Sequence, residues 1–197
     1  SMLSYPEEAH ASAARYYLSE QTAQNTVEAI YHLVKANELQ KVFSIMAQEV
    51  QEERYRMLEE GYASPLLEIL SQISISGIDK KSMVYLFNIE GKAYAMIEKW
   101  QESKERLGQA LQIAEKLGDG MLIAHTKQVI GEAFYLKGEF ASAEKFLLDA
   151  ASLFKSHNAK DDLKNIYMKL TRMYFATGRP EKSQKYSDLA IASSRKG

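Results

Sequence analysis

Cysteine is absent from the 197-residue sequence, and proline occurs only three times. Without cysteine the chain has neither a disulfide framework nor a thiolate metal site, and this composition fits a cytoplasmic protein. The three prolines, Pro6, Pro65 and Pro180, stand where helices are expected to begin, a position that tolerates the missing N–H group. They therefore separate helices and do not interrupt them.

Long apolar runs and an excess of either charge are also missing. No apolar run approaches the roughly 20 residues that span a bilayer, and the first residues do not form a signal peptide. A formal net charge of −1 gives no general attraction to nucleic acid or to anionic lipid, so neither is expected as a partner. Ser1 in front of Met2 is interpreted as a residue left by protein expression, and the natural chain is expected to begin elsewhere.

Helical periodicity dominates what is present. Apolar residues recur at helical spacing, as in Leu86, Ile89 and Ala93, whereas strand-like alternation is confined to residues 71–78, which we interpret as a loop. Eleven helices are predicted, at 6–20, 23–36, 38–47, 50–60, 64–74, 79–97, 100–117, 120–137, 140–156, 160–177 and 180–195. Short glycine-closed turns make consecutive helices antiparallel. The predicted fold is all-α, an α-solenoid of about five stacked helical hairpins.

A 40-residue period becomes visible when the sequence is compared with itself. Gly91, Gly131 and Thr171 are 40 residues apart, and an aromatic residue follows three positions after each. The repeating small and aromatic residues predict the closest contacts between paired helices, because helix axes at about 8 to 10 Å leave room only for small side chains. The predicted repeat-packing residues are Gly91, Tyr94, Ser103, Ala110, Gly131, Phe134, Ala143, Ala150, Tyr174, Ser183 and Ala190.

At these positions the chain resembles the tetratricopeptide repeat. Residues 87–111 match through Phe87, Gly91, Tyr94, Ser103, Leu107 and Ala110; residues 130–150 through Ile130, Gly131, Phe134, Ala143, Leu147 and Ala150; and residues 167–190 through Tyr167, Leu170, Tyr174, Ser183 and Ala190. The last copy departs at Thr171 and Ser187, which suits a terminal repeat. The resemblance implies three repeats, 79–118, 119–158 and 159–197, that continue a degenerate helical-repeat region over residues 1–78 as one solenoid.

A second resemblance concerns the N-terminal region. Residues 10–48 are similar to the helical arm of signal-transducing ATPases with numerous domains, including the maltose-type transcriptional activators. The residues that carry this likeness are His10, Ala13, Ala14, Tyr16, Tyr17, Glu28, Ala29, Ile30 and His32, with the LLEIL segment at 66–70. This resemblance implies that an N-terminal NTPase domain, absent from this chain, precedes the helical region in the whole protein.

Signatures of catalysis and cofactor binding were not found. No glycine begins a phosphate-binding loop, and the EGKAY segment at 90–94 lacks both the upstream glycine and the hydroxyl residue of that motif. The four histidines are scattered, so that no metal site is predicted, and clustered carboxylates are interpreted as solvated helix faces. In ERYRMLEEGY (53–62) the acidic residues offset Arg54 and Arg56, which argues against nucleic-acid binding. We expect no catalytic residue, no cofactor and no metal.

The inner wall of such a solenoid comes from the first helix of each hairpin. Counting from the small residue of each repeat, the concave groove is predicted to display Tyr85, Asn88, Lys92, Met96, His125, Gln128, Glu132, Tyr135, Asn165, Met168, Arg172 and Phe175. Aromatic and amide side chains, with Lys92 and Arg172 as separated positive points, suit the binding of an extended peptide.

Three functional hypotheses follow. The first is a non-catalytic scaffold or sensor module that binds a protein, a peptide or a small effector in its groove as part of a signalling or regulatory protein. The second is a phosphatase-like helical accessory domain, for which Gln128 and Glu132 on one helix face are the candidate pair. The third is a dimerisation module, in which the groove and the ends of the array form a homodimer.

Overall fold

The structure is a computed structural model that describes residues 5–20, 22–51 and 55–194. Its helices are α1 (Tyr5–Leu18), α2 (Ala23–Lys35), α3 (Leu39–Gln51), α4 (Arg56–Glu59), α5 (Ala63–Leu70), α6 (Lys80–Met96), α7 (Trp100–Leu117), α8 (Gly120–Leu136), α9 (Phe140–Ser156), α10 (Lys160–Ala176) and α11 (Pro180–Ser194). No strand occurs in the described ranges, and residues 71–78 form turns and bends. The prediction of an all-α fold is confirmed.

Two compact units divide the chain, Ser1–Arg106 and Leu107–Gly197. The division lies within α7, whereas the sequence places its boundary between residues 78 and 79. The first unit contains α1 to α6 and the start of α7, and the second contains the remainder of α7 with α8 to α11. The 40-residue repeat boundaries stay a prediction, and each unit is described below by itself.

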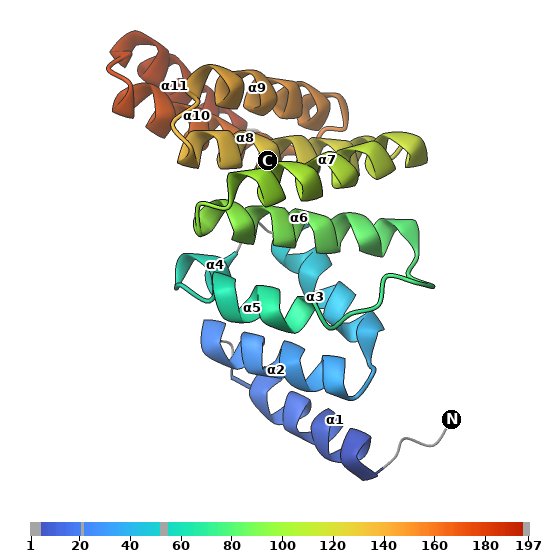
Figure 1. Cartoon of the computed structure of the whole chain (residues 1–197). Helices are drawn as coiled ribbons and strands as arrows, with labels where there is room; N and C mark the ends of the chain where they lie inside the picture. The colour runs from blue at the N-terminus through green and yellow to red at the C-terminus, as the bar shows by residue number, and fades with distance from the viewer. Residues whose placement is uncertain (1–4, 21, 52–54, 195–197) are drawn as a thin grey trace. The chain divides into compact units, whose positions relative to one another are not determined.

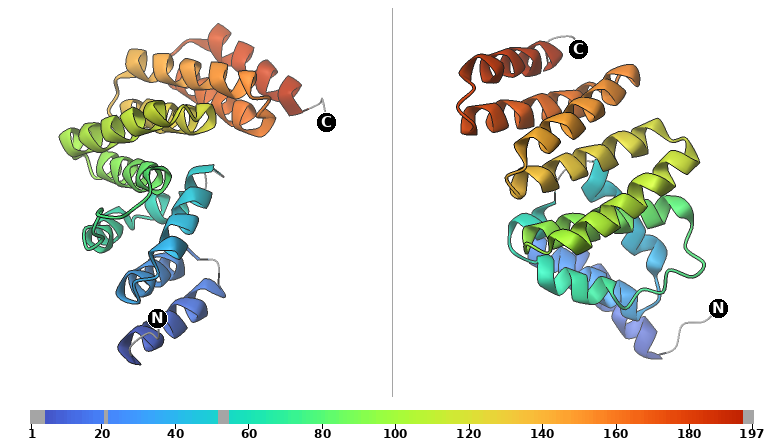
Figure 2. Two further views of the ribbon diagram at one scale, coloured as in Figure 1. Left: turned by 90° about the vertical axis from the view of Figure 1, so that its right-hand side faces the viewer. Right: turned by 45° about the horizontal axis from the view of Figure 1, so that its top comes forward.

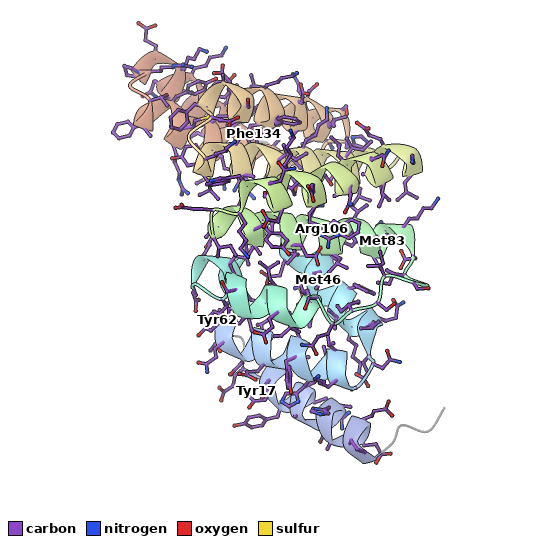
Figure 3. The ribbon with its side chains drawn as sticks, in the orientation of Figure 1. Tyr17, Met46, Tyr62, Met83, Arg106 and Phe134 are labelled. Carbon is purple, nitrogen blue, oxygen red and sulfur yellow. The ribbon has the colours of Figure 1, made fainter. Side chains whose placement is uncertain are left out.

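The second unit is built from two antiparallel hairpins. Helix α8 packs along α9, α10 packs along α11, and α10 also lies against α9, as Figures 1 and 2 show. One apolar core joins these helices. It consists of the buried residues Ala124, Ala143, Leu147, Ala150, Ala151, Phe154, Ile166, Leu170, Met173 and Tyr174. Phe134 of α8, labelled in Figure 3, stacks on Phe146 of α9 with 5.6 Å between the ring centroids.

The first unit combines one hairpin with a less regular group of helices. Helix α1 packs along α2, while α3 and α5 both pack against α6. Apolar side chains on these helices are fully or nearly fully buried, among them Ile30, Leu33, Met46, Leu66, Leu70, Leu86 and Ile89. Met46 of α3 and Tyr17 of α1 are labelled in Figure 3, and the Tyr17 ring stacks on His32 of α2 at 5.5 Å.

Side-chain caps explain where several helices begin. The Asp79 carboxylate accepts hydrogen bonds from the backbone N–H groups of Lys81 and Ser82, both at 3.0 Å, and so caps α6. Asp119 accepts from the N–H group of Leu122 at 3.0 Å and caps α8, as its sequence position predicts. Each cap satisfies N–H groups that have no carbonyl partner within the first helical turn.

The region around residues 50–60 differs from the single helix that the sequence predicts there. Helix α3 continues to Gln51, and only the four residues Arg56–Glu59 form α4. Tyr55 stands before α4 in a left-handed conformation, with φ +33° and ψ +27°, which is incompatible with one continuous right-handed helix. Glu53 and Arg54 of the ERYRMLEEGY segment (53–62) lie outside the described residues.

Candidate ligand-binding wall on α8 and α10

Helices α8 and α10 lie in parallel register. Lys169 Nζ of α10 approaches Glu132 Oε1 of α8 to 2.9 Å, and His125 Nε2 of α8 lies 3.8 Å from Asp162 Oδ1 of α10. Both contacts join residues 37 positions apart. Because the two contacts have the same spacing and are seven residues apart along each helix, the helices run in the same direction with a fixed offset.

Adding the same offset to the remaining inner-face residues aligns two further levels. It places Asn165 at the level of Gln128 and Arg172 at the level of Tyr135. Residues spaced by three or four positions share one face of a helix. The offset therefore arranges six of the predicted groove residues in four successive levels of α8 and α10: His125, Gln128, Glu132, Tyr135, Asn165 and Arg172.

His125 is a buried and neutral member of this wall. His125 is 5% exposed. Burial lowers its pKa from 6.5 to about 4, and the charge of Asp119 opposes this shift with a smaller effect. Burial also raises the pKa of Asp162. The His125 ring packs edge-on against Phe154 at 5.0 Å, and its Nδ1 atom has no hydrogen-bond partner among the described residues.

Gln128 occupies the next level and is 1% exposed. Its Nε2 group donates a hydrogen bond to Glu132 Oε1 at 3.1 Å, the same carboxylate oxygen that Lys169 contacts. The other end of the amide, Oε1, has no hydrogen-bond partner within the described part of the chain. A buried acceptor left in this state costs about 1–3 kcal/mol relative to a satisfied one.

The upper levels of the wall are open to solvent. Tyr135, Met168 and Arg172 are exposed, and Phe175, one turn beyond, is 79% exposed. Asn165 is half-buried. Tyr135 also packs edge-on against Phe140 of α9 at 5.8 Å. The wall thus combines buried imidazole and amide groups and a half-buried ion pair with an exposed aromatic and cationic edge.

The predicted groove residues of the first unit are less exposed than those of the second unit. Tyr85, Asn88 and Lys92 of α6 are buried, and Met96 is half-buried. Lys92 Nζ lies over the ring of Tyr55, 3.3 Å from its centroid, so the structure does not present Lys92 as a positive point on an open wall. The hydroxyl group of Tyr85 accepts a hydrogen bond from Gln51 at 2.9 Å. A ligand-binding role for these four residues stays a prediction.

An ion pair between a buried glutamate and a half-buried arginine, which the sequence did not suggest, also lies in the first unit. Arg106 Nε approaches Glu90 Oε2 to 3.0 Å, and the guanidinium group lies 5.1 Å from the ring centroid of Phe87. Burial raises the pKa of Glu90, and the charge of Arg106 partly offsets this shift. Arg106, labelled in Figure 3, therefore holds a carboxylate inside the unit and fixes the start of α7 to α6.

The repeat-packing residues occupy the contacts between paired helices. The Ser103 hydroxyl donates to the carbonyl oxygen of Gly91 at 2.7 Å, and the Ser183 hydroxyl donates to that of Thr171 at 3.0 Å. A side chain at Gly131 would bring its Cβ atom to 2.8 Å from Leu147 Cγ. Of the remaining predicted packing residues, Ala110, Ala143, Ala150, Tyr174 and Ala190 are buried, whereas Tyr94 and Phe134 are half-buried.

Two side chains that join α10 to α8 were not predicted as groove residues from the sequence. Asp162 and Lys169 were not included among the groove residues, yet they are the α10 partners of His125 and Glu132. The sequence signal for these contacts is a spacing of 37 residues between His125 and Asp162 and between Glu132 and Lys169. An alignment with the 40-residue repeat does not bring these residues together. Among the described residues, no three or more histidine, aspartate and glutamate side chains lie together in an arrangement that could hold a metal ion.

Comparison of the sequence with known proteins gives a partial match to a curated protein. No protein-family model matches. Response regulator aspartate phosphatase J of Bacillus subtilis is 26% identical over 133 residues, which are 68% of this chain but 35% of the relative. The chain therefore spans about a third of the length of that curated relative. Neither finding assigns the chain to a family.

Three solved structures share the fold. The crystal structure of aspartyl phosphate phosphatase F from Bacillus subtilis superposes with a TM-score of 0.65 at 15% identity, over 97% of this chain and 51% of that one. A Rap protein complexed with competence and sporulation factor gives 0.59 at 21% identity, over 96% and 50%. BtubC from P. vanneervenii gives 0.59 at 18%, over 96% and 74%. These matches establish the helical-repeat fold, and the resemblance to signalling ATPases stays a prediction.

Proposed function

We propose that the chain is a non-catalytic helical-repeat module of a signalling or regulatory protein, and that the wall formed by α8 and α10 binds a peptide or a peptide segment of a partner protein. The likeness to a Rap protein solved with competence and sporulation factor supports this proposal. The name of the curated relative, response regulator aspartate phosphatase J, also supports it, because response regulators are signalling proteins.

The buried Oε1 atom of Gln128 is the observation that carries the proposal. Polar groups buried in proteins are nearly always hydrogen-bonded, and an exception calls for an explanation. The neighbouring Glu132 carboxylate is engaged, since it receives both the Gln128 amide and the Lys169 ammonium group. An N–H group of a bound peptide backbone would donate a hydrogen bond to this acceptor. Binding would then remove the free-energy cost of the unsatisfied acceptor.

Substitution of Gln128 tests this role directly. Short synthetic peptides are screened against the whole chain, and the tightest binder becomes the probe. The variant Gln128→Met keeps the length and shape of the side chain but removes the acceptor, and it also removes the Nε2 donor to Glu132, whose carboxylate still pairs with Lys169. We expect it to bind the probe about tenfold more weakly, equivalent to roughly 1.4 kcal/mol, while its melting temperature stays the same or rises. Isothermal titration calorimetry and thermal unfolding provide the two measurements.

A matched substitution on the surface provides the control. Gln112→Met changes an exposed glutamine of α7 and should leave both peptide affinity and stability unchanged. Equal affinity of the Gln128→Met variant and the wild-type chain would contradict the proposed role of the wall. Loss of affinity together with a large loss of stability would assign Gln128 a structural role instead.

The names of two similar proteins, an aspartate phosphatase and an aspartyl phosphate phosphatase, favour a second candidate function. In this alternative, Gln128 and Glu132 act on a phosphorylated response regulator. Their arrangement argues against it, because the Glu132 carboxylate is already held by the Gln128 amide and by Lys169. The time course of dephosphorylation of a phosphorylated response regulator should be the same with the wild-type chain and with a Gln128→Ala, Glu132→Ala variant; slower dephosphorylation by the variant would support the catalytic reading.

Further expectations from the sequence belong to the same proposal. A cytoplasmic location, an N-terminal NTPase domain in the whole protein and a homodimer remain hypotheses. Within the described residues, none of the helices is both long and apolar enough to cross a membrane. The genomic reading frame upstream of Met2 tests for the NTPase domain, and light scattering over a range of concentrations tests for the dimer.

A further inference from the structure

Two histidine side chains join α1 to α2 in the first unit. The Nδ1 atoms of His10 and His32 are 2.7 Å apart, and the ring centroids are separated by 5.0 Å. Because the two nitrogen atoms are within hydrogen-bonding distance, one of them carries a proton and donates a hydrogen bond to the other. The rings therefore form a direct polar link between the two helices of the hairpin.

Aromatic side chains surround this link. The ring of Tyr17 on α1 stacks on His32 at 5.5 Å, with 12° between the ring planes (Figure 3). Tyr31 on α2 lies edge-on to His10 at 6.1 Å and to His32 at 5.1 Å, and Lys35 Nζ lies 5.7 Å from the Tyr31 ring centroid. The two histidines and the two tyrosines are half-buried. Water competes less with a hydrogen bond inside such a cluster than with one on an open surface.

The number of protons on the two rings decides whether the link can form. In the neutral pair, one Nδ1 atom donates and the other accepts. A first added proton can bind the distant Nε2 atom of the donating ring, so that the hydrogen bond persists and becomes charge-assisted. A second added proton must bind the accepting Nδ1 atom, and two N–H groups then face each other between two positive rings. The link is therefore compatible with a neutral or a singly charged pair, but not with a doubly charged pair.

Burial and charge both oppose the second proton. Burial lowers the pKa of His32, the charge of His10 lowers it further, and Glu28, four residues earlier on α2, raises it with a smaller effect. On α1, Glu7 stands three residues before His10. Helices α3, α4 and α5 also pack against α2, but within the described part of the chain they add no charge to this pKa shift. In the unfolded chain the pKa of His32 is about 6.5, so the link loses its stabilising effect as the pH falls below that value.

Helix α1 buries little apolar surface besides this cluster. Of its described residues only Ala11 and Ala14 are fully buried, and each contributes a single methyl group. Its main packing partner is α2. Because hydrophobic stabilisation scales with the buried apolar area, one polar contact is a large part of what holds α1 on α2.

We propose that His10 and His32 form a pH-sensitive latch, which holds α1 on α2 at neutral pH and releases α1 when both rings are protonated as the pH falls. The latch is a regulatory feature of the first unit. It goes beyond the proposed function, because the peptide-binding wall lies on α8 and α10 in the second unit.

Exchange of backbone amides with deuterium measures the release of α1. Exchange in the whole chain is followed by mass spectrometry at pH 7.5 and pH 5, with EDTA present so that the histidines bind protons only, and is corrected for the intrinsic effect of pH. We expect the protection of α1 to fall about tenfold at pH 5, the change expected when one hydrogen bond is lost. Helix α6, most of which is buried in the same unit, is the internal reference and should lose less protection.

The variant His10→Asn tests whether the two histidines act together. The asparagine amide can donate to a neutral His32 ring or accept from a protonated one, so that it keeps the link at both pH values. We expect the protection of α1 in this variant to be the same at pH 7.5 and pH 5. The matched control is His157→Asn, at an exposed histidine of the second unit, which should lose α1 protection as the wild-type chain does.

Nitrogen NMR of the histidine rings provides a second measurement. The chain has four histidines, so that single substitutions assign every ring signal in a sample labelled with ¹⁵N-histidine. The rings of His10 and His32 should take up their protons in two separate steps, as interacting groups do. The loss of α1 protection should follow the second step.

Three results would overturn the proposal. The first is equal protection of α1 at both pH values in the wild-type chain. The second is an equal loss of protection in α1 and α6, because the whole unit would then loosen. The third is the same loss in His10→Asn as in the wild-type chain. Gln128→Met should not alter the exchange of α1, so that this proposal and the peptide-binding wall fail independently.

Discussion

At the scale of single residues, Gly131 shows how a glycine within a helix is constrained by its neighbour. A Cβ atom there would lie 2.8 Å from Leu147 Cγ and 3.2 Å from the Leu147 backbone nitrogen, which cannot move aside freely. We predict that Gly131→Leu lowers the free energy of unfolding by roughly 1–3 kcal/mol through overpacking. Urea denaturation measures the change.

Gly108 of α7 is the matched control, because nothing lies within 4 Å of a Cβ atom at that position. Gly108→Leu should be neutral or should stabilise the chain by up to about 1 kcal/mol, since leucine has the higher helix propensity. If both variants unfolded at the same urea concentration, the close approach of Leu147 would not be what excludes a side chain from position 131.

At the scale of structural elements, the turns within hairpins repeat one conformation. Gly138 joins α8 to α9 with φ +81°, Gly178 joins α10 to α11 with φ +67°, and Glu98 joins α6 to α7 with φ +61°. Glutamate is strained in this left-handed region, where glycine is not. We predict that Glu98→Gly raises the free energy of unfolding by about 1 kcal/mol, measured by urea denaturation.

The reverse exchange in the next hairpin is the control. Gly138→Glu should lower the free energy of unfolding by a similar amount, about 1 kcal/mol, because it introduces the strain that Glu98→Gly removes. A stabilising effect of Gly138→Glu would show that a side-chain contact, and not the backbone conformation, governs these turns.

At the scale of the whole molecule, buried histidine makes stability depend on pH. The pKa of His125 is about 4 in the folded chain and 6.5 without burial, so the unfolded state binds the proton more readily. Its contribution is complete above pH 6.5 and is lost as the pH falls towards 4. We predict that this residue alone lowers the free energy of unfolding by about 2 kcal/mol between pH 7.5 and pH 5.

Comparison with His125→Gln isolates this contribution. Denaturation at the two pH values should show a loss that is smaller by about 2 kcal/mol in the variant. His32, whose pKa is lowered by burial and by His10, contributes in the same direction in both proteins, and the raised pKa of Asp162 acts in the opposite direction in both. An unchanged pH dependence in the variant would mean that His125 is protonated as readily in the folded chain as in the unfolded one.

Periodicity and turn chemistry were sufficient to predict the all-α fold and most helix bounds, because amphipathic spacing and the Asp119 cap are local properties. The short α4 was not predictable, since the left-handed Tyr55 depends on tertiary packing that buries its ring under Lys92. Likewise, helical spacing placed Gln128 and Asn88 on an inner face, but it gave no information about their burial. Burial depends on how helices distant in the sequence approach one another.

The offset between α8 and α10 has a consequence for alignment-based reasoning. Contacts join residues 37 apart, whereas the repeat is 40 residues long, so equivalent residues of adjacent repeats are displaced by three positions, about 4.5 Å along the helix axis. A consensus design that stacks repeats column by column would treat Gln128 and Met168 as neighbours. The 37-residue offset of the two observed contacts instead places Asn165 at the level of Gln128, and a designed ligand site should follow this diagonal.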